Sequence, residues 1–171
     1  QKVIGSVQHL EYSIADALNK ITKAKQKKIA IIKGNGEFHE AFIAKFLLQV
    51  RESYHIGPFT LDSVAKNPTG SLAALEKYDL AIIAKPTETF TDSEKQVLDQ
   101  FIMNGGKTMW LIDQVAVEMD SLYNNSGATL AYPRDLNLND MFFKYGIRIN
   151  PDIVKDEQGS PIKLASGDPG S

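Results

Sequence analysis

The chain alternates between segments whose apolar residues recur every three or four positions and short runs that are apolar throughout. The first segment, within residues 1–27, predicts an amphipathic helix. The same spacing predicts helices over residues 42–50 and 91–102, with a shorter one over 71–77. A last helix is expected to be capped by Asn137 and closed by Gly146. The apolar face of the first predicted helix consists of Val7, Leu10, Ile14, Ala17, Leu18 and Ile21.

Three of the apolar runs have no polar alternation, which is typical of strands covered on both faces of a parallel sheet. These runs are Ile29–Ile32, Leu80–Ala84 and Thr108–Ile112. We expect them to be adjacent, parallel and buried on both faces. Pro58–Leu61 is a weaker strand that suits a sheet edge. Ile153 and Val154 are expected to form a final short strand.

Strands that alternate with helices through short connections indicate right-handed βαβ crossovers. The sequence therefore predicts an α/β fold, a three-layer α/β/α sandwich with a mostly parallel, flavodoxin-like sheet. We expect a single domain, with a helix in residues 1–27, the sandwich in residues 28–158 and a flexible tail in residues 159–171. Because the chain begins at Gln1 without an initiator Met, we expect it to be a segment of a larger protein.

Composition narrows the function classes. The formal net charge is −2, which gives no electrostatic reason to expect nucleic acid as a partner. The chain has no cysteine, which excludes disulfides, thiolate nucleophiles and zinc sites built on cysteine. No cofactor is expected.

The residues that follow the predicted strands are the candidates for binding chemistry. Gly34–Glu37 lies between a strand and a helix, where α/β sheets bind ligands. His39 stands where a dinucleotide fingerprint needs its third glycine, and no Gly-Lys-Ser/Thr completes a phosphate-binding loop. A structural turn with a helix cap is the favoured interpretation, and no metal site is predicted. The candidate ligand-binding residues are Asn35, Glu37, His39, Thr87 and Asp113.

Residues 115–133 form a long connection that we expect to be partly helical. This connection carries more aromatic and apolar residues than a solvated linker requires, and Phe143 lies off the apolar stripe of the last predicted helix. The candidate partner-binding residues are therefore Tyr123, Tyr132 and Phe143. The alternative is that these side chains only cover the edge of the sheet.

Several segments carry a resemblance to a known family. Residues 90–95 (FTDSEK), 98–107 (LDQFIMNGGK), 110–113 (WLID) and 135–150 (DLNLNDMFFKYGIRIN) resemble the gliding-motility-associated ABC transporter substrate-binding component, GldG. Gly34–Glu37 resembles the Gly-His-Gly-Glu turn of that family, with Asn in place of His. The resemblance is most specific over Lys144–Asn150 and covers nearly the whole chain.

The resemblance implies an ABC-type transport auxiliary protein at the extracytoplasmic, periplasmic face of the bacterial inner membrane. It implies anchoring through membrane segments outside this chain, with an ABC permease and ATPase as partners. It also implies kinship with GIFT domains and with the class I glutamine-amidotransferase-like fold. The amidotransferase activity does not carry over, because it needs a cysteine that this chain lacks.

Three functions follow as hypotheses. The favoured one is a non-catalytic interaction or scaffold domain of an ABC-transporter-associated membrane protein. The second is a small-ligand module for a sugar or peptide. The third is a hydrolase built on Glu37, His39 and Asp113, which lacks a paired acid and base at plausible spacing.

Overall fold

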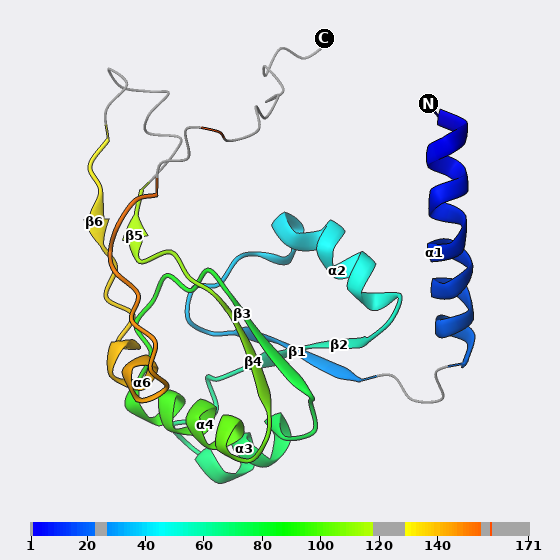
Figure 1. Ribbon diagram of the computed structural model, residues 1–171. Helices are drawn as coiled ribbons and strands as arrows, with labels where there is room; N and C mark the ends of the chain where they lie inside the picture. Colours follow the sequence, from blue (N-terminus) through cyan, green and yellow to red (C-terminus); the bar gives the residue numbers. More distant parts are fainter. Residues whose placement is uncertain (1, 23–26, 118–128, 155–157, 159–171) are drawn as a thin grey trace.

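A parallel four-stranded sheet forms the centre of the molecule. The computed structural model describes residues 2–22, 27–117, 129–154 and 158. The strands are β1 (Lys28–Lys33), β2 (His55–Thr60), β3 (Leu80–Ala84) and β4 (Lys107–Leu111), in the order β2-β1-β3-β4 (Figure 1). All the pairings are parallel. The predicted adjacent parallel strands are confirmed. The edge strand predicted over Pro58–Leu61 is confirmed as β2, which begins earlier, at His55.

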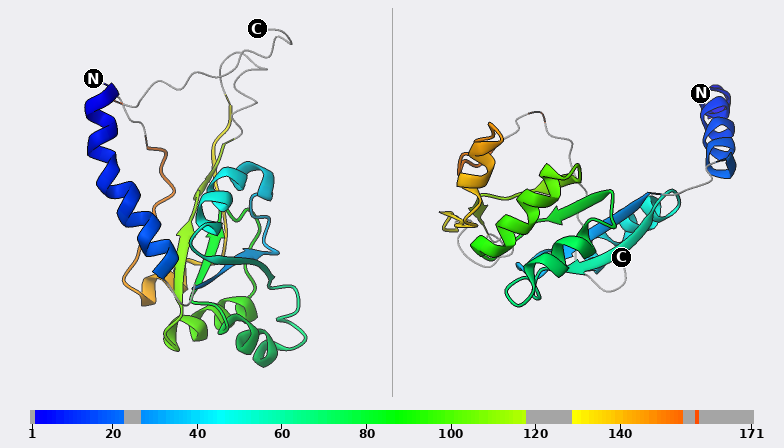
Figure 2. Two further views of the ribbon diagram at one scale, coloured as in Figure 1. Left: turned by 90° about the vertical axis from the view of Figure 1, so that its right-hand side faces the viewer. Right: turned by 90° about the horizontal axis from the view of Figure 1, so that it is seen from below.

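Helices lie on both faces of this sheet and give it three layers. The short 3-10 helix η1 (Glu40–Ile43) and α2 (Ala44–Arg51) follow β1 and cover one face. The other face carries α3 (Pro68–Leu75), α4 (Asp92–Met103) and α6 (Asn139–Lys144) (Figures 1 and 2). The predicted α/β/α class is confirmed.

The strand residues divide between two hydrophobic clusters because successive side chains point to opposite faces. Ala30, Ile32, Ala81 and Ile83 belong to the large cluster with α3, α4 and α6. Ile29, Ile31 and Ile82 belong to a small cluster on the α2 side, where Leu47 and Val50 pack against them. The larger cluster is therefore the main core.

Strand β4 corrects one prediction, since it is exposed on one face and only partly buried on the other. Trp110 packs against the large cluster. On the opposite face Met109 is 40% exposed and Leu111 is also exposed. Helix α2 packs against the small cluster through Leu47 and Val50, and no residue of β4 belongs to that cluster. An apolar run in the sequence does not show whether a helix packs against each face of the strand.

The region after β4 differs from the sequence prediction in three places. Val115–Ala116 (β5) pairs with Tyr132–Pro133 (β6) as an antiparallel ribbon, so the base of the expected partly helical excursion is extended. Asn137 does not cap α6: its φ is +55° and its side chain points to Phe90. Ile153 and Val154 are exposed and form no strand.

Helix α1 (Lys2–Thr22) confirms the predicted first helix and stands apart from the sandwich (Figure 2). The expected tail, residues 159–171, lies outside the described residues. Of the helices that the structure describes, none has both the length and the apolar character that crossing a membrane requires.

Candidate functional site

The candidate site lies at the carboxyl ends of β1 and β3. The chain leaves β1 for β2 on one side of the sheet and β3 for β4 on the other, so the strand order reverses between them. Open α/β sheets bind ligands in the crevice that forms at such a point. The loops after β1 and β3 therefore decide what this domain can bind there.

These two loops are hydrogen-bonded to each other across the crevice. The Thr87 and Glu88 backbone N–H groups both donate to the Asn35 carbonyl, at 2.9 and 3.0 Å. The Thr87 hydroxyl donates to the Gly36 carbonyl at 2.9 Å, and the Phe38 N–H donates to the Ala84 carbonyl at 3.1 Å. The N–H and carbonyl groups that a ligand would bind in these loops are therefore already hydrogen-bonded within the protein.

Gly36 makes this close approach possible. Its φ is +69°, in the left-handed region that glycine adopts readily. A Cβ at this position would collide with Thr87 Oγ1. The glycine in the turn is therefore explained by loop packing and does not require a phosphate.

Asn35 is buried and Glu37 is partly buried in the turn after β1. Asn35 Nδ2 donates to Glu94 Oε2 at 3.3 Å, and Glu37 Oε2 accepts from the Asn35 N–H at 2.9 Å. Burial raises the pKa of Glu37, although backbone hydrogen bonds and Lys33 act in the opposite direction. Within the described residues, Asn35 Oδ1 and Glu37 Oε1 have no hydrogen-bond donor. The crevice therefore retains two acceptor atoms.

The other two candidate ligand residues are engaged elsewhere. His39 Nδ1 accepts from the Ala41 N–H at 3.3 Å and caps η1. Asp113 forms an ion pair with Lys85 at 3.5 Å, and the Lys85 ammonium lies 4.7 Å from the centre of the Phe38 ring. The structure brings Asn35, Glu37 and Thr87 together. It gives His39 and Asp113 other partners, so the three residues of the hydrolase hypothesis form no hydrogen-bonded set.

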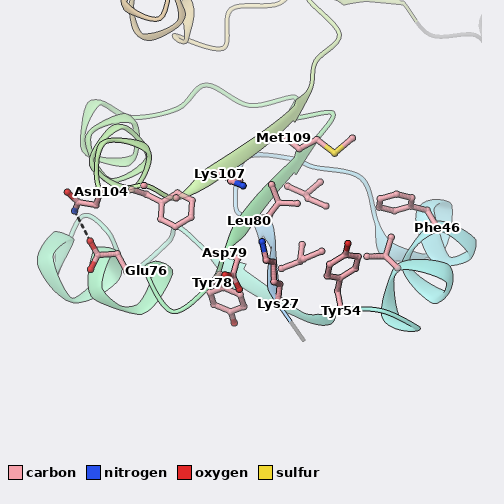
Figure 3. A pocket seen from close by; sticks show the side chains of 16 residues that line it. Lys27, Phe46, Tyr54, Glu76, Tyr78, Asp79, Leu80, Asn104, Lys107 and Met109 are labelled. Atoms are coloured by element: carbon pink, nitrogen blue, oxygen red, sulfur yellow. Dashed lines mark hydrogen bonds between the residues drawn. The ribbon is translucent and has the colours of Figure 1, made fainter. Parts of the chain in front are cut away.

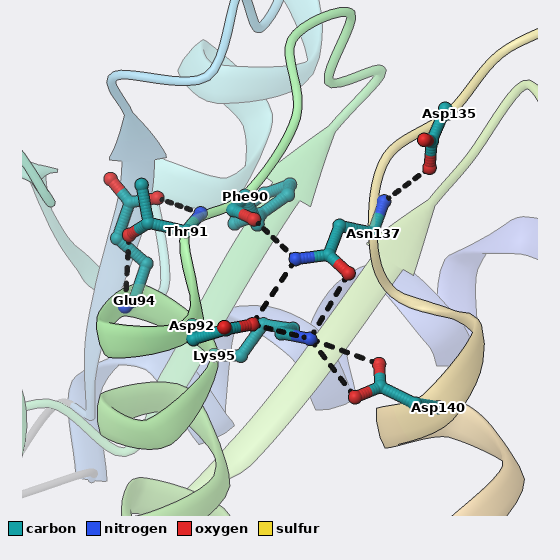
Figure 4. A network of polar contacts seen from close by, with 8 residues as sticks. All are labelled: Phe90, Thr91, Asp92, Glu94, Lys95, Asp135, Asn137 and Asp140. Carbon is teal, nitrogen blue, oxygen red and sulfur yellow. Dashed lines mark hydrogen bonds and ion pairs between the residues drawn. The ribbon is translucent and has the colours of Figure 1, made fainter.

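A second polar cluster, absent from the sequence prediction, joins α4 to α6 and to the residues just before α6 (Figure 4). Lys95 is only 8% exposed. Its ammonium contacts Asp92 at 3.0 Å, Asp140 at 2.9 Å and Asn137 Oδ1 at 3.2 Å. Asn137 Nδ2 donates in turn to the Phe90 carbonyl at 2.9 Å. This Lys95 cluster therefore ties together two segments that lie far apart in sequence.

Charge explains the protonation states in the Lys95 cluster. Hydrogen bonds from Lys95 lower the pKa of both Asp92 and Asp140. Burial acts to lower the pKa of Lys95, but Asp140 and Asp92 outweigh it and raise that pKa. The cluster is fully ionised near neutral pH. Among the described residues, no group of three His, Asp or Glu side chains could hold a metal ion.

The candidate partner residues lie on exposed surface where the structure describes them. Phe143 is 76% exposed on α6, whereas its neighbour Phe142 is buried. Tyr132 is exposed on β6. Tyr123 lies outside the described residues. A hollow of about 530 Å³ lies beside α6, and its lining includes Phe143, Ile147 and Ile149.

Comparison with known families decides the class of protein. The family described as "ABC-type uncharacterized transport system" matches residues 26–171. The chain belongs to this family. It is a family of auxiliary components of ABC-type transport systems and not a class of enzymes, so the domain has a role in such a system. The segments on both sides of the Lys95 cluster, residues 90–95 and 135–150, lie within the matched range.

Further comparisons add little to the family assignment. No functionally curated protein shows detectable sequence similarity to the chain. Among solved structures, the mmIFT52 N-terminal domain is similar, with 21% identity and a TM-score of 0.43. That similarity covers 51% of this chain and 36% of the other.

Proposed function

We propose that this domain is a non-catalytic interaction domain of an ABC-type transport complex of the gliding-motility type. The closed crevice is the observation that carries the proposal. The place where an α/β sheet binds its ligand is filled here by hydrogen bonds between the protein's own loops. Contact with another protein then requires a surface elsewhere on the domain.

The hollow beside α6 is the surface that fits this role. Phe143 and Ile147 are exposed apolar side chains at its lining. Interface centres are enriched in aromatic residues that fill pockets on the partner. We propose that a permease subunit contacts this hollow at the periplasmic face of the inner membrane, with the ATPase as the further partner. Membrane segments outside this chain would hold the domain at that face.

The substitution Phe143→Ala tests the interface. Because the side chain is exposed, the free energy of unfolding should change by less than about 0.5 kcal/mol. Association with the purified permease–ATPase complex should weaken by about tenfold, as for a central interface aromatic. Met103→Ala on α4, another exposed apolar residue, is the matched control and should leave association unchanged. Equal binding by the wild type and both variants would refute the interface.

A second candidate function rests on the two acceptor atoms of the crevice, Asn35 Oδ1 and Glu37 Oε1. Sugar hydroxyls and peptide N–H groups are donors that would satisfy both if the two loops separated, since both atoms are buried. Thermal unfolding with a panel of sugars and short peptides distinguishes this candidate from the interaction domain. A ligand that stabilises the wild type but not Glu37→Gln would favour the small-ligand module.

A further inference from the structure

A second surface hollow lies at the amino ends of the strands, between α2 on one side and the C-terminal end of α4 on the other. It is a groove of about 750 Å³ beside α2, running across β1, β3 and β4 (Figure 3). The exposed face of β4 forms one part of it through Met109, and Leu80 and Ile82 of β3 form another. Phe46, Val50 and Tyr54 line the α2 side. The groove is therefore the place where the second helical layer of the sandwich is incomplete.

The two carboxylates that line this groove already accept hydrogen bonds from the protein itself. Glu76 accepts from Asn104 Nδ2 at 2.7 Å. Asp79 Oδ2 accepts from the Lys28 N–H at 2.8 Å. A small polar ligand would find few free carboxylate oxygens there. A stripe of apolar side chains could pack against Leu80, Ile82 and Met109. The groove therefore fits an amphipathic helix better than a sugar or a cationic metabolite.

Helix α1 presents such a stripe. Leu10, Ile14, Leu18 and Ile21 are spaced by three or four residues, and all four are exposed. The stripe extends about 16 Å at 1.5 Å per residue. A strand of five residues, such as β4, has a length of about 17 Å. The apolar stripe of α1 and the exposed face of β4 are therefore similar in length.

The covalent connection places α1 at the correct end of the groove. Helix α1 ends at Thr22, β1 begins at Lys28, and Lys27 itself lines the groove. The connecting residues span at most about 20 Å when fully extended. Connections of this length are typical between a helix and the strand that follows it in α/β proteins. Helix α1 can therefore reach the groove and run antiparallel to β1 without any change in the sheet.

We propose that α1 packs into this groove of its own chain, with its Leu10–Ile21 stripe against Leu80, Ile82 and Met109. The packed helix buries two apolar surfaces at once and completes the layer that α2 begins. This inference is independent of the proposed interaction with a transport complex, because it concerns a different face of the sheet.

Hydrogen exchange of the whole chain tests the packing. Leu18→Asp places a charge on the stripe, and Met109→Asp places one on the groove floor. Each should increase the exchange rate of the α1 amides at least tenfold, while the β1 amides remain protected. Asn19→Asp, on the opposite side of α1, is the matched control and should leave exchange unchanged. Equal α1 exchange in the wild type and all three variants would overturn the proposal.

Cross-linking separates packing within one chain from packing between two chains. The natural sequence has no cysteine, so Leu18→Cys with Met109→Cys introduces the only two thiols. A disulfide within one chain is expected under mild oxidation, and Asn19→Cys with Met109→Cys should form much less. A disulfide found only between two chains would show that a second copy supplies the helix and would overturn the proposal as stated.

Discussion

Lys95 shows how a single residue joins two sequence segments. Its ammonium is held by Asp92, Asp140 and Asn137, and the last two lie more than 40 residues away. The i, i+3 spacing of Asp92 and Lys95 is visible in the sequence. Nothing local shows that Asp140 and Asn137 complete the cluster, because only the fold brings them to α4. Sequence analysis assigned Asn137 to a helix cap for the same reason.

The substitution Lys95→Met should lower the free energy of unfolding by about 1 to 2 kcal/mol at neutral pH. Met keeps the buried stem but removes the charge-assisted hydrogen bonds, whose aspartate partners are solvent-exposed and therefore screened. Chemical denaturation measures the change. Lys144→Met, an exposed lysine on α6, is the control and should stay within about 0.5 kcal/mol of the wild type.

The difference in free energy of unfolding between the wild type and Lys95→Met should also depend on pH, in a direction set by the two aspartates. The pKa values of Asp92 and Asp140 are lowered on folding from their ordinary value of 3.8. The stability that their ionised forms provide is therefore present above pH 3.8 and lost as the pH falls through the folded pKa values. The difference between wild type and Lys95→Met should narrow in acid. A difference that stays constant would contradict the role of the aspartates.

At the scale of elements, the loops after β1 and β3 behave as one closed unit. Gly36→Ala should destabilise the protein more than Gly146→Ala. Both glycines have similar φ angles, +69° and +74°, so each substitution carries the same backbone cost of about 1 kcal/mol. Only at Gly36 would the new methyl group collide with Thr87, since a Cβ at Gly146 meets nothing within 4 Å. Thermal unfolding of both variants measures the difference.

A third variant checks the cause of that difference. Thr87→Ala removes the atom with which the methyl group collides. Combined with Gly36→Ala, it should cost less than the sum of the two single changes, because residues in contact are not additive. Full additivity would show that the two loops are not packed as the structure has them.

The sequence predicted these elements well where the pattern was complete within one segment. The helix predicted over residues 91–102 and the apolar strands β1 and β3 needed only local residues and were confirmed. Asn35, Glu37 and Thr87 could be brought together because parallel strands end at one edge. The prediction that β4 is buried on both faces was wrong for one face, since an apolar run does not reveal which helices pack against it. Whether the crevice is open or closed also depends on loop hydrogen bonds that no sequence pattern encodes.

For the whole molecule, Trp110 marks the junction between the sheet and the segment after β6. Its ring packs edge-on against Phe142 of α6 at 5.1 Å and against Phe90 at 6.0 Å between centroids. Phe142 belongs to the large core cluster, so α6 shares one core with α3 and α4. Residues on both sides of the β5–β6 ribbon are therefore expected to unfold together as a single domain.

The substitution Phe142→Ala tests this unity, with Phe143→Ala as its neighbouring control. Loss of the buried ring should cost about 3 kcal/mol, whereas loss of the exposed one should cost little. Because Trp110 is the only tryptophan, its fluorescence reports the α6 junction, and far-UV circular dichroism reports all helices and strands. In a single cooperative domain, Phe142→Ala shifts both transitions to the same lower denaturant concentration. A fluorescence transition that moves alone would mean that α6 and the segment before it unfold separately from the sheet.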